Sequence, residues 1–205
     1  MRPKQPKSPE EILQKAIPLF ANAGFSGVSM RQIAKQVNIS AAALYHHFPD
    51  KETLYLSAVD LVFKEKAQHL LLALHASGTL ETRLYGVILQ FIRVVGMDHT
   101  FRAVMQREML EGEPERLRIM ADRMFKQSFG EMRALAAEIA PGGDATLLAG
   151  TLVSLVAYHF QTRALRPYLP GYQPCHESPE HLARFYTQLI LEGGRRLPRL
   201  DGASA

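Results

Sequence analysis

The sequence has a single cysteine, Cys175, and no long uninterrupted apolar run. One cysteine excludes a disulfide within the chain and is typical of a reducing cytoplasm, where we expect this protein to act. A transmembrane helix needs about 18 or more apolar residues in a row, so we expect no membrane span. The basic first residues are not followed by an apolar segment, and we therefore expect no secretory signal there.

Catalytic motifs are also missing. The sequence has no GxSxG, HExxH, glycine-rich phosphate loop or CxxC. Cys175, His176 and His181 are possible metal ligands, but their proline-rich surroundings give them no fixed geometry. Cys175 also lacks a nearby cation that would activate it as a redox sensor. We therefore predict no enzyme, no catalytic residue, no cofactor and no metal site.

Positive charge is concentrated near the N-terminus. Residues 1–51 hold seven Lys or Arg against three acidic residues, and this excess equals the net charge of +4 of all 205 residues. The rest of the chain is balanced, with 17 basic and 17 acidic side chains. A cationic segment on a neutral body suits binding to a phosphate backbone, although the same excess also fits a basic tail without function.

The apolar pattern is helical throughout, and we find no convincing strand. Ser8 to Glu11 form a capping box that predicts a helix ending before Gly24. Pro18 lies inside it and is expected to bend the chain near Gln14. Glycine and proline separate the further helices that the pattern predicts. These are expected over 51–76, 80–97, 100–111, 114–139, 145–160 and 179–191, with a long loop over 167–178, so the fold class is all-α.

Residues 28–51 predict two short helices joined by a tight turn. Ser29 is a good N-cap for the first helix, and Ser40 is a good N-cap for the second, which runs from Ala41 to Phe48. Leu44 and Phe48 are expected to pack back onto the first helix. Ala42 and His46 then point outward, because successive residues are about 100° apart around a helix. This geometry fits the major groove of DNA, although an αα-hairpin in an ordinary helical bundle gives the same pattern.

The segment from Ile12 to about Leu56 resembles the DNA-binding domain of the tetracycline-repressor (TetR) family. The residues that carry the resemblance are Ala16 to Phe20, the Gly24-Phe25 turn, Ser29 with Ile33-Ala34, and Leu44 to Phe48 followed by Lys51. Members of the family are mostly dimeric, ligand-responsive transcriptional repressors. The resemblance therefore implies an N-terminal three-helix helix-turn-helix domain over residues 1–54, and a larger helical ligand-binding and dimerisation domain over 55–205.

Several residues of the predicted helix-turn-helix are expected to contact DNA. Lys51 follows Asp50, a good N-cap, and a cation at this helix end is unfavourable unless an anion lies nearby. The resemblance implies that Lys51 binds the DNA backbone. The predicted DNA-binding residues are Ser29, Met30, Arg31, Ala41, Ala42, Ala43, Tyr45, His46, His47 and Lys51.

The three alanines that open the second helix limit how bases are recognised. An alanine methyl can contact a thymine methyl but forms no hydrogen bond. Polar readout is then left to Arg31, which can bind a guanine, unless Arg31 only binds phosphate. We predict an inverted-repeat operator with one dominant G·C position in each half and A·T-leaning preferences elsewhere.

Ala145 to Phe160 contain no charged residue. A helix that is apolar all round must be covered on every side, so we predict core on one side and a partner subunit on the other. With the helix after Pro179 it forms the predicted two-fold interface, and His159 is expected to be hydrogen-bonded in the core or interface. The interface residues are Leu148, Gly150, Thr151, Leu155, Leu182, Phe185 and Leu189.

Six of the eight methionines lie between Met97 and Met132. Methionine is pliable, so they are candidates for an adaptable pocket for a hydrophobic molecule, although an ordinary core fits as well. The predicted lining is Phe91, Met97, Met105, Met109, Met120 and Met124. Polar residues on the adjoining segments are expected to be mostly solvated, with some able to bind an acidic group: Arg93, His99, Arg102, Arg107 and Glu108.

The sequence as a whole predicts a sequence-specific DNA-binding transcriptional regulator. We expect a homodimeric repressor that a small hydrophobic or amphipathic ligand releases from double-stranded operator DNA. The alternative is a helical ligand-carrier or interaction protein whose basic N-terminal segment binds an anionic partner other than DNA.

Overall fold

The computed structural model describes residues 8–197, except for the side chains of Glu65 and Met97. Within this range the chain forms helices and no strand, which confirms the predicted all-α class. The described residues divide into two compact units. The first unit contains residues 8–65 and 99–124, and the second contains residues 66–98 and 125–197.

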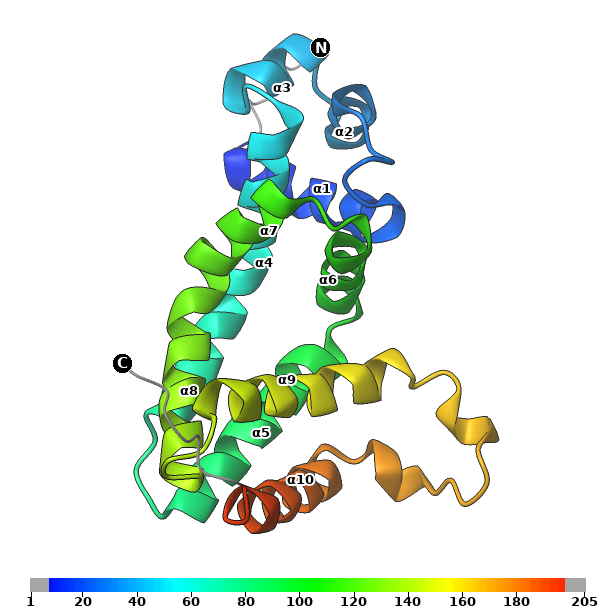
Figure 1. Ribbon diagram of the computed structural model, residues 1–205. Coiled ribbons are helices and arrows are strands. Elements are labelled where there is room, and N and C mark those ends of the chain that lie inside the picture. The colour runs from blue at the N-terminus through cyan, green and yellow to red at the C-terminus, as the bar shows by residue number, and fades with distance from the viewer. Residues whose placement is uncertain (1–7, 198–205) are drawn as a thin grey trace. The chain divides into compact units, whose positions relative to one another are not determined.

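The first unit is built around the N-terminal helices (Figure 1). Its elements are α1 (Pro9–Ala23), α2 (Met30–Val37), α3 (Ala41–His47), the first part of α4 (Lys51–Leu74), α6 (His99–Glu111) and α7 (Pro114–Met120). The predicted capping box is present, because the Glu11 amide donates to Ser8 Oγ at 3.1 Å and the Ser8 amide donates to Glu11 Oε2 at 3.3 Å. α1 continues through Pro18, which lies on its exposed side.

The core of the first unit lies where α1 packs against α2 and α6. The rings of Phe20 and Tyr55 meet edge to face at 4.8 Å, and Phe63 contacts Phe101 at the same centroid distance. α2 packs in turn on α3. The fully buried side chains here include Ile12, Phe20, Ile33, Leu44, Leu54 and Tyr55.

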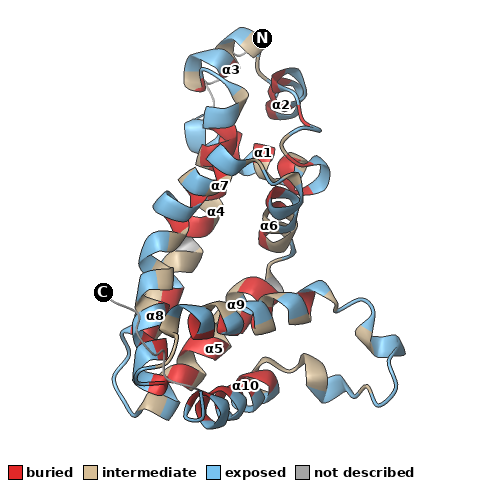
Figure 2. Ribbon diagram, in the orientation of Figure 1, coloured by how far each residue is buried: buried red, intermediate tan, exposed pale blue. Residues whose placement is uncertain are grey.

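In the second unit, α5 (Leu80–Met97) packs against three other helices: α8 (Lys126–Ile139), α9 (Ala145–Gln161) and α10 (Pro179–Gly194). α5 and α9 come close at Gly96, where an added Cβ would lie 2.5 Å from Phe160 Cζ. A side chain at position 96 would therefore displace the Phe160 ring. Figure 2 shows the buried residues of these helices on the sides that face one another.

Two elements contain details that the sequence pattern did not predict. The predicted helix over 114–139 is interrupted by a π-helical segment, η1 (Ala121–Phe125), which separates α7 from α8. Such wide turns carry no glycine or proline signal, so the sequence pattern does not reveal them. The predicted loop over 167–178 contains two 3-10 turns, η2 (Arg166–Tyr168) and η3 (Pro174–Glu177).

The two units do not coincide with the predicted domains. The predicted boundary between residues 54 and 55 lies inside α4, and residues 99–124 belong to the same unit as the N-terminal helices. The predicted boundary divides the chain by function, whereas the two units are defined by contacts. The boundary therefore stays a prediction. None of the helices within residues 8–197 combines the length and hydropathy that a bilayer crossing requires.

Candidate nucleic-acid interface

Three caps hold the ends of α2 and the start of α3. Ser29 Oγ accepts from the Gln32 amide at 3.3 Å, and Gln32 Oε1 accepts from the Ser29 amide at 2.8 Å. Asn38 ends α2 in the left-handed region at φ 65°, a conformation that asparagine tolerates. Ser40 then caps α3 through the Ala43 amide at 3.1 Å. The helix-turn-helix is therefore held by local hydrogen bonds at each helix end.

α3 presents the faces that its spacing predicts. Leu44 is fully buried, and Phe48 is 6% exposed. Ala42 and His46 are exposed, and 51% of Tyr45 is exposed. Ala41, Ala43 and His47 are half-buried at the flanks. α3 is thus packed along one side and open to a partner along the other.

A hollow of about 470 Å³ lies at the N-terminus of α2. We call it the α2 hollow, and its lining residues are Ser26, Gly27, Val28, Ser29, Met30, Arg31, Gln32, Tyr45 and Lys51. None of these residues is acidic, and two are cationic. The first amides of a helix and its dipole also favour negative charge. The α2 hollow therefore suits an anion such as a phosphate.

Lys51 is held at the edge of the α2 hollow. Its Nζ donates to the Phe25 carbonyl at 3.0 Å and lies 4.2 Å from the centre of the Phe25 ring. The preceding residue caps α4 as predicted, since Asp50 Oδ1 accepts from the Thr53 amide at 2.6 Å. That hydrogen bond lowers the pKa of Asp50.

Met30 is the predicted DNA-binding residue whose side chain is buried. It is 7% exposed and belongs to the core of the first unit. Met30 is the first residue of α2, and it contributes to the lining of the α2 hollow. Arg31, its neighbour, is exposed.

Behind the α2 hollow lies a buried charged network that the sequence reasoning missed. Most of the five polar residues near the methionines were expected to be solvated, and Arg93, His99 and Arg107 are exposed, but the Glu108 side chain is fully buried. Tyr55 Oη donates to Glu108 Oε2 at 2.7 Å, and Arg116 Nε donates to Glu108 Oε1 at 2.9 Å. Burial, and then the hydrogen bond to Glu108, raise the pKa of Tyr55. Tyr55 lies 53 positions before Glu108, and Arg116 lies on the next helix, so no pattern within one helix signals these contacts.

The same network continues to the turn between α1 and α2. Arg116 Nη2 donates to Glu111 Oε2 at 3.0 Å, and Glu111 Oε1 accepts from the Ser26 amide at 3.4 Å. Arg107 Nη2 donates to the Asn22 carbonyl at 2.6 Å. Gly24 has φ 72°, and a Cβ there would overlap the Glu111 carboxylate. The end of α6 is therefore tied closely to the base of the helix-turn-helix.

The predicted ligand-pocket residues are divided between the two units. Phe91 and Met97 belong to the second unit, and the side chain of Met97 lies outside the described residues. The other four belong to the first unit. There Met120 and Met124 are buried, Met105 is half-buried and Met109 is 55% exposed. The ligand pocket stays a prediction.

Two of the predicted interface residues are buried within the chain itself. Leu148 and Leu182 are each 6% exposed, so their side chains pack in the core rather than toward a partner. A helix without charges shows no polar side, so the sequence could not tell its core face from its outer face. The outer face of α9 carries Leu147, Thr151, Ser154 and Tyr158, beside the half-buried Gly150 and Leu155, and that of α10 carries Phe185 and Leu189.

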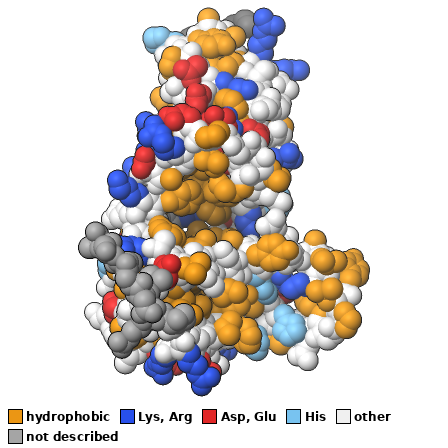
Figure 3. All heavy atoms as spheres, viewed as in Figure 1, with side chains coloured by type: hydrophobic (Ala, Val, Ile, Leu, Met, Phe, Trp, Pro, Cys, Tyr) orange, Lys and Arg blue, Asp and Glu red, His pale blue; other side chains and the backbone are white. Residues whose placement is uncertain are grey.

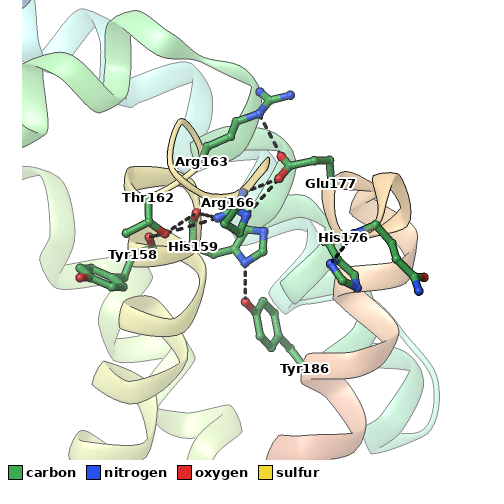
Figure 4. A network of polar contacts seen from close by, with 9 residues as sticks. Tyr158, His159, Thr162, Arg163, Arg166, His176, Glu177 and Tyr186 are labelled. Carbon is green, nitrogen blue, oxygen red and sulfur yellow. Dashed lines mark hydrogen bonds and ion pairs between the residues drawn. The ribbon is translucent and has the colours of Figure 1, made fainter. Parts of the chain in front are cut away.

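Beyond α9, a second polar network fastens the segment over 162–178 (Figure 4). Arg166 Nη2 donates to Glu177 Oε1 at 2.7 Å, and another Arg166 nitrogen donates to the His159 carbonyl. His159 Nδ1 and Tyr186 Oη are 3.1 Å apart. His159 is therefore hydrogen-bonded, as predicted. Burial, and next the nearby Arg166 charge, lower the pKa of His159.

Comparison with known proteins identifies the N-terminal helices. The family model described as bacterial regulatory proteins, tetR family, matches residues 12–58. The biofilm operon icaADBC HTH-type negative transcriptional regulator IcaR of Staphylococcus aureus is 32% identical over 83 residues. That alignment takes in 40% of this chain and 45% of the relative, so the chain spans less than half the length of this curated protein.

Solved structures extend the likeness to the whole fold. The TetR family transcriptional regulator PfmR from Thermus thermophilus is 25% identical, with 94% of this chain and 98% of PfmR covered and a TM-score of 0.68. The transcriptional regulator FadR from Bacillus subtilis, solved with stearoyl-CoA, shares the fold at 18% identity and a TM-score of 0.73, with 91% and 99% covered. Residues 12–58 therefore match the tetR family of bacterial regulatory proteins, and the fold of the chain is similar to that of PfmR.

Proposed function

We propose that this protein is a sequence-specific DNA-binding transcriptional regulator. It acts as a homodimeric repressor on an inverted-repeat operator, and a small hydrophobic or amphipathic ligand releases it. The observation that carries the proposal is the α2 hollow beside the open face of α3. It is lined by Arg31 and Lys51 without any acidic residue, inside the segment that matches the family model.

DNA binding would use the two short helices in different ways. The open face of α3 enters the major groove, where the alanine methyls contact thymine methyls. The α2 hollow receives a backbone phosphate, bound by the amide end at Ser29, the Tyr45 hydroxyl and Lys51 Nζ. His46 and His47, at the end of α3, lie near the DNA strand that carries this phosphate. Arg31 recognises a guanine base.

Binding-site selection on wild type and Arg31→Ala tests the proposal most directly. We expect wild type to select an inverted repeat with one dominant G·C position in each half. Arg31→Ala should relax that position at a cost of about 1–3 kcal/mol. If both proteins select the same base there, Arg31 binds only phosphate. If neither selects any sequence, the proposed function is wrong.

The phosphate contact of Lys51 has its own measurement. Lys51→Ala should weaken binding to all sequences about equally and flatten the slope of log affinity against log salt by about one unit. Lys64→Ala is the control, since Lys64 is exposed on α4 about 20 Å further along the helix. A slope that is equal in wild type and Lys51→Ala contradicts this contact.

The homodimer is proposed from the outer faces of α9 and α10. Leu147, Tyr158 and Phe185 are 68%, 65% and 56% exposed there. The Thr151 and Ser154 hydroxyls bond to carbonyls of their own helix, so they add little polarity to the surface. Apolar area of this kind is stabilised by burial against a second copy.

Gly150→Glu tests this interface. An added Cβ at Gly150 meets no atom within 4 Å in the chain, so the variant should fold but fail to dimerise. We expect monomers by light scattering and loss of operator binding. Gly130→Glu on α8, where an added Cβ is equally unobstructed, is the matched control and should stay dimeric. A monomeric wild-type protein at micromolar concentration would exclude the interface.

Coenzyme A thioesters are the first ligands to test, because FadR from Bacillus subtilis, which shares this fold, was solved with stearoyl-CoA. We expect a long-chain thioester to release the protein from its selected site in a mobility-shift assay. Free coenzyme A, which lacks the acyl chain, should not release it. If no chain length changes DNA affinity, the ligand belongs to another class.

A further inference from the structure

Two cations share the ring of Phe25. Lys51 Nζ and the Arg116 guanidinium carbon each lie 4.2 Å from its centre. Lys51 also donates to the Phe25 carbonyl at 3.0 Å, so both the ring and the backbone of this residue hold its ammonium group. Phe25 in turn contacts Tyr55 edge to face at 5.2 Å. Phe25 therefore connects the edge of the α2 hollow to the buried network behind it.

Arg116 is fixed far more firmly than Lys51. It is 5% exposed, and its ion pairs with Glu108 and Glu111 measure 2.9 and 3.0 Å. Two carboxylates beside one guanidinium supply the negative charge that lets a second cation approach the same ring. A guanidinium held by two carboxylates also has a defined plane, and this suits stacking on an aromatic ring.

We propose that Arg116 is a positioning residue for the phosphate contact of Lys51 and acts through Phe25. This inference rests on the proposed DNA-binding function and adds a residue from α7, outside the helix-turn-helix. Arg116 fixes the Phe25 ring, and Phe25 fixes Lys51 Nζ at the edge of the α2 hollow. A flexible lysine chain loses much rotamer freedom on binding, so a lysine already held in place binds phosphate at a lower entropic cost.

The arrangement makes DNA affinity depend on the junction of α6 and α7. Glu108 and Glu111 lie on α6, and Arg116 lies on α7. A change at this junction would reach Lys51 through Phe25 without any movement of α3. A change at the junction of α6 and α7 is therefore expected to alter phosphate binding through Lys51.

The test uses variants that keep the buried charges balanced. Glu108→Gln with Arg116→Met removes both charges of the pair, and Phe25→Leu keeps an apolar side chain but removes the ring. Binding of each variant to a fluorescein-labelled random-sequence duplex is measured by anisotropy across a salt series. Lys51→Ala should flatten the slope by about 0.9. We expect the paired variant and Phe25→Leu to flatten it by most of that amount, and to add nothing when combined with Lys51→Ala.

Arg118→Met is the matched control, because Arg118 also lies on α7 but is exposed and pairs with Glu115. Its slope should equal that of wild type. If the paired variant and Phe25→Leu weaken binding without changing the slope, while Lys51→Ala flattens it, the inference is wrong and the proposed function stands. If Lys51→Ala leaves the slope unchanged, the phosphate contact fails and the inference fails with it. A wild-type protein without DNA affinity refutes the proposed function itself.

A second measurement needs no DNA. Reductive methylation of the free protein, followed by peptide mass spectrometry, gives the rate at which Lys51 reacts relative to the exposed Lys64. We expect Lys51 to react severalfold faster in the paired variant and in Phe25→Leu than in wild type. Unfolding curves confirm that each variant is folded before it is compared. Equal rates in folded variants and wild type would show that Phe25 does not hold Lys51, which overturns the inference.

Discussion

Glu108–Arg116 in the first unit and Arg166–Glu177 in the second both join separate segments, yet they differ in burial. The Glu108 and Arg116 side chains are 0% and 6% exposed, and their closest atoms are 2.9 Å apart. Arg166 and Glu177 are 12% and 17% exposed, with a shorter contact of 2.7 Å. Distance alone would rank the second pair as the stronger. Burial reverses the ranking, because a charge that has lost its partner costs more away from water.

The two networks also differ in what they hold. Glu108 and Arg116 fix the base of the helix-turn-helix through Tyr55 and Phe25. Arg166 and Glu177 fasten the segment over 162–178, where Leu165, Tyr168 and Leu169 are 57%, 83% and 49% exposed. Figure 3 shows hydrophobic side chains gathered over that segment. The buried network therefore supports the proposed DNA-binding surface. The partly exposed network supports the exposed segment between α9 and α10.

The largest loss of stability should come from breaking the buried Glu108–Arg116 pair. Arg116→Met alone leaves Glu108 buried without its cation and should lower the free energy of unfolding by about 3–5 kcal/mol. Urea unfolding followed by circular dichroism measures it. Glu108→Gln with Arg116→Met should recover most of the loss, since position 108 is then neutral and the carboxylate that has lost its cation, Glu111, is 21% exposed. If Arg116→Met alone were as stable as wild type, burial would not determine the cost of removing one partner of an ion pair.

Breaking the partly exposed Arg166–Glu177 pair should cost less stability. Arg166→Met removes hydrogen bonds to Glu177 and to the His159 carbonyl, where water can partly replace them, and we expect a loss of about 1–2 kcal/mol. The same unfolding experiment applies, with Glu177→Gln as the companion variant. A loss equal to that of Arg116→Met would mean that the number of contacts, rather than burial, governs both networks.

Local signals in the sequence predicted the helix ends well. Ser8, Ser29, Ser40 and Asp50 all cap the helices that they were expected to cap. A cap depends on residues within one turn, so a sequence window contains all the information. The exposed face of α3 followed in the same way from its spacing.

Features that depend on distant partners could not be predicted. Glu108 is buried because Tyr55, 53 positions earlier, and Arg116, beyond the end of α6, satisfy its oxygens. Leu148 and Leu182 are apolar residues on apolar helix faces, so the sequence around them does not distinguish a core position from a surface position. The Phe25 contacts with Lys51 and Arg116 likewise appear only when α7 is folded beside the helix-turn-helix.

A smaller effect on stability is expected from the titration of His159, in the network of Arg166 and Glu177. Burial and Arg166 hold the pKa of His159 below its ordinary value of 6.5. Above that pH the imidazole is neutral in both states, and stability is not affected. As the pH falls below 6.5, the unfolded chain binds the proton first, so stability is lost until the pH passes the lowered folded pKa.

Stability measured across this range should therefore fall less in His159→Gln than in wild type. Arg166→Met should also reduce the fall, because it removes one cause of the lowered pKa. Tyr186, His176 and Glu177 surround the ring and are kept unchanged in both variants. An identical pH dependence in wild type and His159→Gln would exclude His159 as its source.

The smallest effect is expected at Arg118, and it decides what the comparison means. Arg118 Nη2 and Glu115 Oε1 are 2.7 Å apart, the same distance as in the Arg166–Glu177 pair, but these side chains are 65% and 58% exposed. The hydrogen bonds from Arg118 lower the pKa of Glu115, yet water hydrates both groups in either state of the chain. Arg118→Met should therefore unfold at the same urea concentration as wild type. A loss close to that of Arg166→Met would mean that contact distance, which these two pairs share, sets the cost, and the ranking by burial would have to be abandoned.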